Sequence, residues 1–205
     1  YLGFKGDIRA AGAGSSNQWF YDTWNSEESA WQVSPRAPTG SAPVLYVSFP
    51  SLKDPTHEPG PERRHTGEAV TFVPWEAFAD WRDKKWMRRG GEYESFKQRL
   101  QDAMLEQLFR RLPGLRHMLD YVELSTPVST DHFVRSAGGS IYGLESTPER
   151  FGCTWLRSRT PVPGLLLAGV DVGGPGVMGG AMVGILAAVS TEPFGALRWL
   201  HGKVL

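Results

Sequence analysis

Short apolar runs and longer helical patterns alternate along the first 125 residues. The runs at 44–49, 69–73 and 121–124 are rich in β-branched and aromatic residues and are bounded by turn residues. That combination predicts three strands. Residues 1–43 and 125–160 show little periodicity and many turn residues, so we expect both segments to be rich in loops.

Two helices are predicted between the second and third strands. Pro74 suits the first turn of a helix because it has no backbone N–H to satisfy, and this helix should end near Gly90. The clearer helix follows and ends before Pro113. Its apolar residues recur at four-residue steps, which places them on one face (Phe96, Leu100, Met104 and Leu108).

The chain closes with a predicted strand, turn and helix. Residues 165–172 form an apolar run that predicts a buried strand, and a glycine-rich turn with Pro175 follows. Small and apolar residues then continue to Ala188, which predicts a helix whose first turn is almost bare of side chains. Its free N–H groups and positive dipole end would suit an anionic or electron-rich ligand. Close packing of the helix against a strand is the alternative.

The same segment contains a glycine motif that is typical of nucleotide-binding loops. Gly174, Gly176 and Gly179 spell G-x-G-x-x-G after the predicted strand. However, Pro175 lies inside the tight turn, and no second strand with an acidic ribose ligand follows. We therefore expect an element that completes the Rossmann-like domain of a longer protein, rather than a self-sufficient nucleotide-binding fold.

A membrane-spanning helix is not expected in this segment, although it is apolar. Asp171 and the Gly-Gly-Pro break interrupt the run, and the part after Pro175 is shorter than the ~20 residues that a spanning helix needs. The overlapping GxxxG steps at Gly176, Gly180 and Gly184 fit close helix packing equally well.

Composition indicates an ordinary globular protein with an apolar partner. The 22 basic residues balance the 22 acidic ones among 205, which argues against a nucleic-acid surface. Eight Trp and ten Phe predict a large core or a pocket for a bulky apolar ligand. The chain starts without Met and without a signal peptide, so we expect a fragment or processed product in a cytoplasmic setting.

Several common catalytic and metal-binding patterns are missing from the sequence. The five His residues show no ligand spacing, so no metal site is predicted, and no G-x-S-x-G elbow indicates a serine hydrolase. The single Cys153 excludes an internal disulfide and is expected to be a buried structural thiol. No catalytic residue is assigned.

A basic run with interleaved Trp residues extends from Trp81 to Arg89. Its simplest interpretation is a solvated helix end, where cations interact favourably with the helix dipole. The alternative is a peripheral contact with an anionic membrane surface.

Four stretches carry a resemblance to a known family. They are SFPSLKDPT at 48–56, ELSTP at 123–127, GSIYGLE with Thr147-Pro148 at 139–148, and TPVPGLLLAGVDV with GVMGGA at 160–181. The chain resembles the C-terminal part of an FAD-dependent oxidoreductase of the phytoene desaturase, carotenoid isomerase and retinol saturase type. Relatives commonly have Gln or Asp after the Ala-Gly of the last stretch. Here Val170 follows it, and we take Asp171 as the acidic position.

The resemblance implies a domain layout and a cofactor. Residues 1–160 would be an α+β portion of a substrate-binding domain, 161–192 the closing strand–turn–helix of a Rossmann-like α/β FAD domain, and 193–205 a tail. Gly169 and Asp171 would face the pyrophosphate and ribityl region of FAD. Gly176, Val177 and Met178 would lie beside the flavin ring, and Tyr142 and Gly143 would approach flavin or substrate. NAD(P) is left open as an electron donor or acceptor.

The resemblance also implies a reaction and an incomplete site. The parent protein would desaturate, saturate or isomerise a long apolar polyene, a carotenoid or a retinoid, with the flavin carrying the chemistry. The phosphate-binding half of the FAD site does not occur in these residues, so this chain alone should bind FAD poorly or not at all. The alternative is a non-catalytic lipid- or partner-binding module that keeps the substrate-domain fold.

Overall fold

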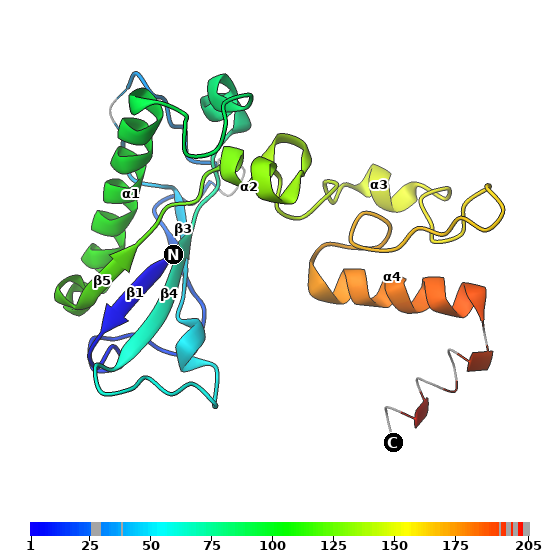
Figure 1. Ribbon diagram of the computed structural model, residues 1–205, viewed down its shortest axis with the longest axis horizontal. Coiled ribbons are helices and arrows are strands. Elements are labelled where there is room, and N and C mark those ends of the chain that lie inside the picture. The colour runs from blue at the N-terminus through cyan, green and yellow to red at the C-terminus, as the bar shows by residue number, and fades with distance from the viewer. Residues whose placement is uncertain (26–29, 38, 193, 196–197, 199–200, 203–205) are drawn as a thin grey trace. The chain divides into compact units, whose positions relative to one another are not determined.

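The chain forms two compact units, Tyr1–Gly139 and Ser140–Leu205, in a computed structural model (Figure 1). The model describes residues 1–25, 30–37, 39–192, 194–195, 198 and 201–202. The boundary between the units comes earlier in the chain than the division predicted at residue 160. That division concerns substrate and cofactor roles and stays a prediction. Much of the predicted tail, 193–205, lies outside the described residues.

The first unit is built on a five-stranded antiparallel sheet with the order β2-β3-β4-β1-β5. The strands are β1 Leu2–Lys5, β2 Gln18–Tyr21, β3 Val44–Ser48, β4 Arg64–Val70 and β5 Leu119–Val122. The three strands expected from apolar runs are present, although β4 and β5 begin before those runs. Residues 1–43, expected to be rich in loops, also contribute β1 and β2, which the sequence did not predict. β1 and β2 have four residues each, too few to show a clear period, and their order comes from pairing with neighbours.

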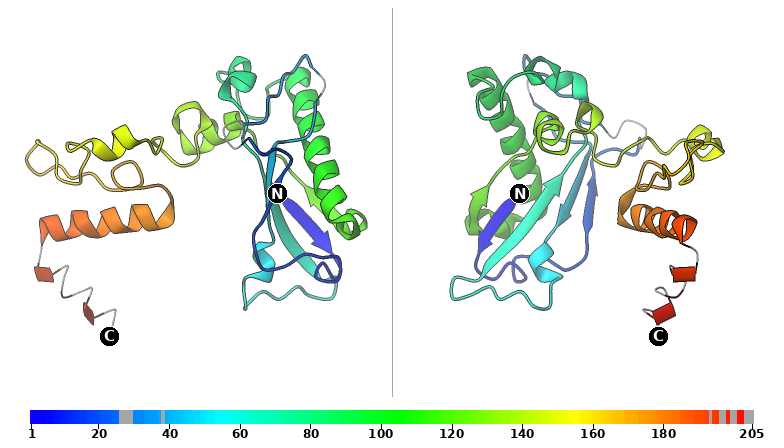
Figure 2. Two further views of the ribbon diagram at one scale, coloured as in Figure 1. Left: turned by 180° about the vertical axis from the view of Figure 1, so that it is seen from behind. Right: turned by 45° about the vertical axis from the view of Figure 1, so that its right-hand side comes forward.

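Helix α1, Gly91–Arg111, packs along one face of this sheet (Figures 1 and 2). The predicted four-residue stripe is confirmed, because Phe96, Leu100 and Leu108 are all buried in the shared core. The sheet contributes Phe4, Leu45, Val47 and Phe49 to that core.

Shorter helical segments complete the first unit. The helix predicted from Pro74 is the 3-10 helix η3, Trp75–Trp81, and it stops well before Gly90. Three further 3-10 segments are η2 Pro50–Leu52, η4 Pro113–Met118 and η5 Ala137–Gly139. Helix α2, Pro127–Val134, lies in a segment predicted to be mostly loop.

The second unit contains helix α3, Pro148–Gly152, and helix α4, Gly176–Thr191. α4 confirms the helix predicted after Pro175. The buried strand predicted at 165–172 was wrong: Leu165 and Leu167 are exposed, and the only pairing described there is a single bridge between Arg159 and Leu166. A strand needs a neighbour to satisfy its backbone groups. The described part of residues 140–205 holds no named strand for it to pair with.

No helix in the described residues is both long enough and apolar enough to cross a membrane.

Candidate functional site

The turn before α4 holds Gly169 and Asp171, and the other three residues predicted to contact a cofactor begin the helix itself. Gly169 has a left-handed backbone, with φ of +107°, and its carbonyl accepts the N–H groups of Val172 and Gly173 at 3.3 and 3.4 Å. These bonds reverse the chain direction over four residues. As a result the turn leads directly into Pro175, which caps the N-terminus of α4.

Asp171 and Arg150 join this turn to the segment before α3. The Asp171 carboxylate accepts the backbone N–H of Leu144 at 2.8 Å. The Arg150 guanidinium donates to the carbonyls of Leu144, Val170 and Gly173. We call these contacts the 150–171 clasp. Because they use a charged donor and a charged acceptor, they are stronger than bonds between neutral groups.

Two glycines make the close approach within the second unit possible. Gly143 has φ of +75°, and a Cβ there would lie 2.2 Å from Oδ1 of Asp171. A Cβ on Gly179 in α4 would lie 1.9 Å from the carbonyl oxygen of Gly174. Both distances are far below contact, so each side chain is excluded by what lies opposite. The first brings the predicted Tyr142–Gly143 stretch next to Asp171, and the second seats α4 on the turn.

The first turn of α4 is left uncovered by its own unit. Val177 is 89% exposed and Met178 is 73% exposed, and no side chain caps the helix start. The helix contains no charged residue, and Met182 and Leu186 continue the exposed apolar surface. A helix that is apolar on all sides is typical of a buried position. This surface therefore has the character of one that receives a ligand or another part of a protein.

The sequence prediction and the structure differ over one residue. Gly169, Asp171, Gly176, Val177 and Met178 are brought together, as expected of neighbours in sequence. Arg150 was missed, although its guanidinium donates to two carbonyls of the turn, those of Val170 and Gly173. Its position six residues after Leu144 carries no recognisable pattern, and only the fold shows that it reaches the turn.

The first unit presents a separate aromatic surface on the sheet face opposite α1. Strand alternation places Trp19 and Tyr21 of β2 beside Tyr46 of β3 on this face. The Trp19 ring lies 4.9 Å from that of Tyr46 and 6.4 Å from that of Tyr21. Trp19 and Tyr21 are about half exposed. These rings form a continuous aromatic surface of the kind that suits a flat apolar ligand.

Tyr121 of β5 lies on the same face of the sheet at its other edge. Its hydroxyl donates to the Glu123 carboxylate at 2.6 Å, and this bond raises the pKa of the Tyr121 phenol above its usual value of 10.0. Tyr121 pairs with Gly3 across the strands, where a Cβ would lie 3.0 Å from Cβ of Tyr121.

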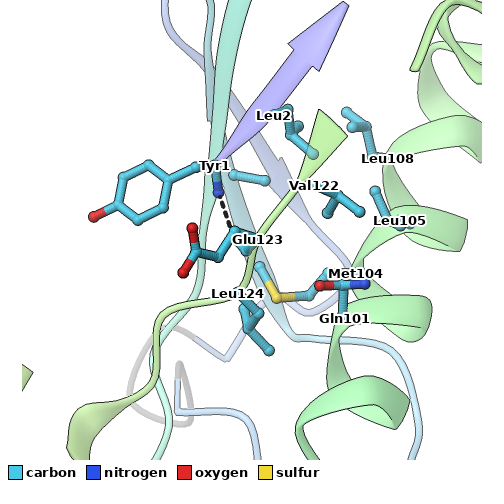
Figure 3. A pocket seen from close by; sticks show the side chains of 10 residues that line it. Tyr1, Leu2, Gln101, Met104, Leu105, Leu108, Val122, Glu123 and Leu124 are labelled. Atoms are coloured by element: carbon cyan, nitrogen blue, oxygen red, sulfur yellow. Dashed lines mark hydrogen bonds between the residues drawn. The ribbon is translucent and has the colours of Figure 1, made fainter. Parts of the chain in front are cut away.

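A small pocket lies on the other side of the sheet, between β1, β5 and α1 (Figure 3). Met104, Leu105 and Leu108 of α1 face Leu2 and Val122 across it. The N-terminal amine of Tyr1 donates to the Glu123 carbonyl at its mouth at 2.8 Å. Its apolar lining belongs to the core, so we do not regard it as the site.

The described residues contain no group of three or more His, Cys, Asp or Glu side chains that would hold a metal ion. Cys153 is half-buried, where the sequence predicted full burial.

The chain is similar to all-trans-retinol 13,14-reductases. It is 27% identical over 191 residues to the one from Danio rerio, a match of 89% of this chain and 32% of the relative. It is 29% identical over 168 residues to the one from Rattus norvegicus, covering 79% and 28% of the two chains. No family model and no solved structure matches.

The similarity to the retinol reductases covers most of this chain but only part of each relative. The chain spans about a third of the length of these curated relatives. A match over 89% of the chain extends beyond the first unit, so the similarity includes both units. A protein described as an inactive all-trans-retinol 13,14-reductase from Danio rerio is also 27% identical, over 199 residues. Identity over this segment therefore does not separate active relatives from an inactive one.

Proposed function

We propose that this chain is the C-terminal part of a flavin-dependent oxidoreductase that acts on a long apolar polyene, with saturation of a retinoid as the leading reaction. The observation that carries the proposal is the similarity to retinol reductases, which are oxidoreductases by name, over most of this chain. The resemblance in the stretches at 139–148 and 160–181 supports FAD as the cofactor. The carotenoid reactions of the wider resemblance are the less favoured substrates.

The geometry of the second unit fits one side of such a cofactor site. The uncapped start of α4 places Gly176, Val177 and Met178 together with no charged side chain, which suits the apolar edge of a flavin ring. The positive end of the helix dipole would stabilise negative charge on that ring. Bound FAD would supply hydride transfer, and this chain would supply the surface that orients it.

Asp171 has a positioning role in this proposal as well as a binding one. Its Oδ1 atom is engaged by the Leu144 N–H, so the carboxylate holds the turn in shape while lying close to the expected ribityl region. Arg150 holds the same turn by two backbone carbonyls, and it also binds the Leu144 carbonyl. The clasp would therefore keep Gly169 and the α4 start in a fixed relation before cofactor binds.

The aromatic face of the sheet is the best candidate for contact with the polyene. Trp19, Tyr21 and Tyr46 offer ring faces along neighbouring strands, and conjugated chains stack well on such surfaces. The sheet holds these rings in fixed positions through its hydrogen bonds. An extended apolar substrate would be oriented by them without any charged contact.

The test is expression of the whole reading frame that contains these residues. We expect a flavin absorption spectrum in the purified protein and reduced products from all-trans-retinol. A Val177→Asp variant should lower flavin content, because it places a charged and hydrated side chain against the apolar ring surface. Val162→Asp, at another exposed valine of the second unit, is the matched control.

Two results would contradict the proposal. One is a purified full-length protein without flavin. The other is a flavoprotein that converts neither retinoids nor carotenoids, which would favour the non-catalytic binding module instead.

A further inference from the structure

An exposed aromatic cluster lies where the segment after η3 meets the end of α2. The ring of Trp86 is 6.1 Å from that of His132 and nearly parallel to it, and 5.2 Å from that of Phe133. Phe133 is 63% exposed and Trp86 is 45% exposed. Their neighbours in sequence, Met87 and Val134, are also exposed. We call these four apolar residues the Trp86 patch.

Basic side chains surround the Trp86 patch. Arg82, Lys84, Lys85 and Arg88 are all exposed in the same short segment, and Arg135 follows Val134 directly. Asp83 is the one acidic residue between Arg82 and Arg88. The chain as a whole is electrically balanced, so this concentration of positive charge is local.

The fold holds this segment in place by burying a cation beneath it. Arg89 is only 5% exposed, and its guanidinium donates to the Val128 carbonyl of α2 at 2.9 Å. It also lies over the ring of Tyr93, 5.1 Å from the ring centre. Tyr93 in turn bonds the Thr126 hydroxyl at 2.8 Å, at the N-cap of α2. The basic segment is thus fastened to α2, and the patch is a built surface.

The backbone turns outward at the apolar tip. Met87 adopts a left-handed conformation, with φ of +59°, and its side chain is 76% exposed. That conformation costs about 1 kcal/mol for a residue with a side chain. An exposed methionine in a strained backbone conformation does not contribute to packing of the core, so a role in contact with a binding partner explains it better.

We propose that the Trp86 patch and its basic rim dock this protein onto an anionic lipid bilayer. Tryptophan, phenylalanine and methionine insert at the level of the lipid headgroups, and lysine and arginine bind the negative surface around them. Positive charge around an apolar centre is complementary to such a surface. The alternative interpretation was a solvated helix end, but η3 stops at Trp81, and only Arg82 of the basic residues adjoins it, as its C-cap.

The proposal is tested with the 205-residue chain and lipid vesicles. The chain should float with mixed phosphatidylcholine–phosphatidylserine vesicles and not with pure phosphatidylcholine. The bound fraction should fall when salt is raised to about 0.5 M, because salt screens the attraction. The double variant Lys84→Glu/Lys85→Glu should need at least about tenfold more lipid for half-maximal binding.

Matched variants distinguish binding by the Trp86 patch from general effects of net charge and surface hydrophobicity. Arg110→Glu/Arg116→Glu makes the same change in net charge in the last turn of α1 and in η4, and should bind as wild type does. Trp86→Ser/Phe133→Ser should weaken binding about as much as the lysine changes, whereas Trp24→Ser, at a fully exposed tryptophan elsewhere, should not. Circular dichroism confirms that each variant is folded.

The proposal is overturned if anionic vesicles do not bind the chain, or if the control variants weaken binding as much as the patch variants. Either result would mean that the Trp86 patch does not dock this chain onto anionic lipid. Neither depends on flavin or on a substrate, so this outcome is independent of the proposed function.

Discussion

At Gly143 the backbone conformation and a neighbouring carboxylate both exclude a side chain. Its φ of +75° disfavours any other residue by about 1–2 kcal/mol. A Cβ would in addition displace the Asp171 oxygen that accepts the Leu144 N–H. Gly143→Ala should therefore abolish protection of the Leu144 amide in hydrogen exchange.

Gly164 provides the control for this prediction. It has a similar φ of +79°, but a Cβ there would meet nothing within 4 Å. Gly164→Ala should carry the backbone strain alone and leave the Leu144 amide protected. Equal loss of protection in both variants would show that strain, and not the clasp, decides the result.

His65 should make stability depend on pH below neutrality. Burial and the nearby His57 lower the pKa of His65 below its usual 6.5, and its Nδ1 lies 3.2 Å from the Ser51 hydroxyl. Below pH 6.5 the unfolded chain then binds a proton that the folded chain resists. This contribution to stability is complete above pH 6.5 and is lost as pH falls from 6.5 through the lower folded pKa.

Urea unfolding at several pH values between 5 and 7.5 measures this effect. His65→Gln should flatten the fall in midpoint between neutral and acid pH. His117→Gln, which changes an exposed histidine, should leave the wild-type fall unchanged. A variant His65→Gln with the full wild-type pH dependence would rule out His65 as its source.

Among the elements, α1 is tied to the β2–β3 connection by one buried side chain. Gln107 is 1% exposed, accepts the Ala42 N–H at 3.0 Å and donates to the Ala42 carbonyl at 2.8 Å. Gln107→Leu leaves both backbone groups unpaired away from water. It should lower the free energy of unfolding by about 2 kcal/mol or more, as measured by urea denaturation.

Gln98→Leu tests whether loss of a glutamine from α1 is enough to cause this effect. Gln98 is exposed and bonds only Asp102 along the same helix, so its replacement should change stability by less than about 0.5 kcal/mol. If the two variants were equally stable, the Ala42 contacts would have no role in holding α1.

The contrast between α1 and residues 165–172 shows where sequence patterns are informative. In α1 the stripe of Phe96, Leu100 and Leu108 repeats over several turns, and one partner surface buries it, so the pattern alone predicts the element. The apolar run at 165–172 matches a buried strand equally well. A strand forms only where neighbouring strands pair with it, and periodicity does not show whether such strands exist. Here the run forms one isolated bridge at Leu166 and then the turn that begins at Gly169.

The candidate site was also predictable only where its residues are close in sequence. Gly169, Asp171 and Gly176 are close in sequence, so their proximity follows from one turn. Arg150 reaches that turn only through the fold of residues 140–175, and no spacing indicates it. The Trp86 patch was predictable in part. The basic run at 81–89 is evident in the sequence, but its contact with α2 is not.

For the whole molecule, the distribution of buried side chains separates the two units. Among the described residues, the connected core contains no residue beyond Val128. In the part of the second unit that the structure describes, Val183 is the one buried hydrophobic residue, and many large apolar side chains are exposed. A unit with so little burial gains little free energy from folding by itself.

Residues 1–139 should therefore fold alone, and residues 140–205 should not. The first fragment retains the whole sheet, α1 and the core, so its thermal midpoint should lie within about 4 °C of that of the full chain, the shift that ~1 kcal/mol produces in a domain of this size. The second fragment should show no cooperative transition. Calorimetry on the two fragments and the intact chain provides the measurement. A cooperative transition in residues 140–205 alone would show that the exposed apolar residues of α4 find partners within their own unit, and it would remove the reason to expect a ligand or further polypeptide on that helix.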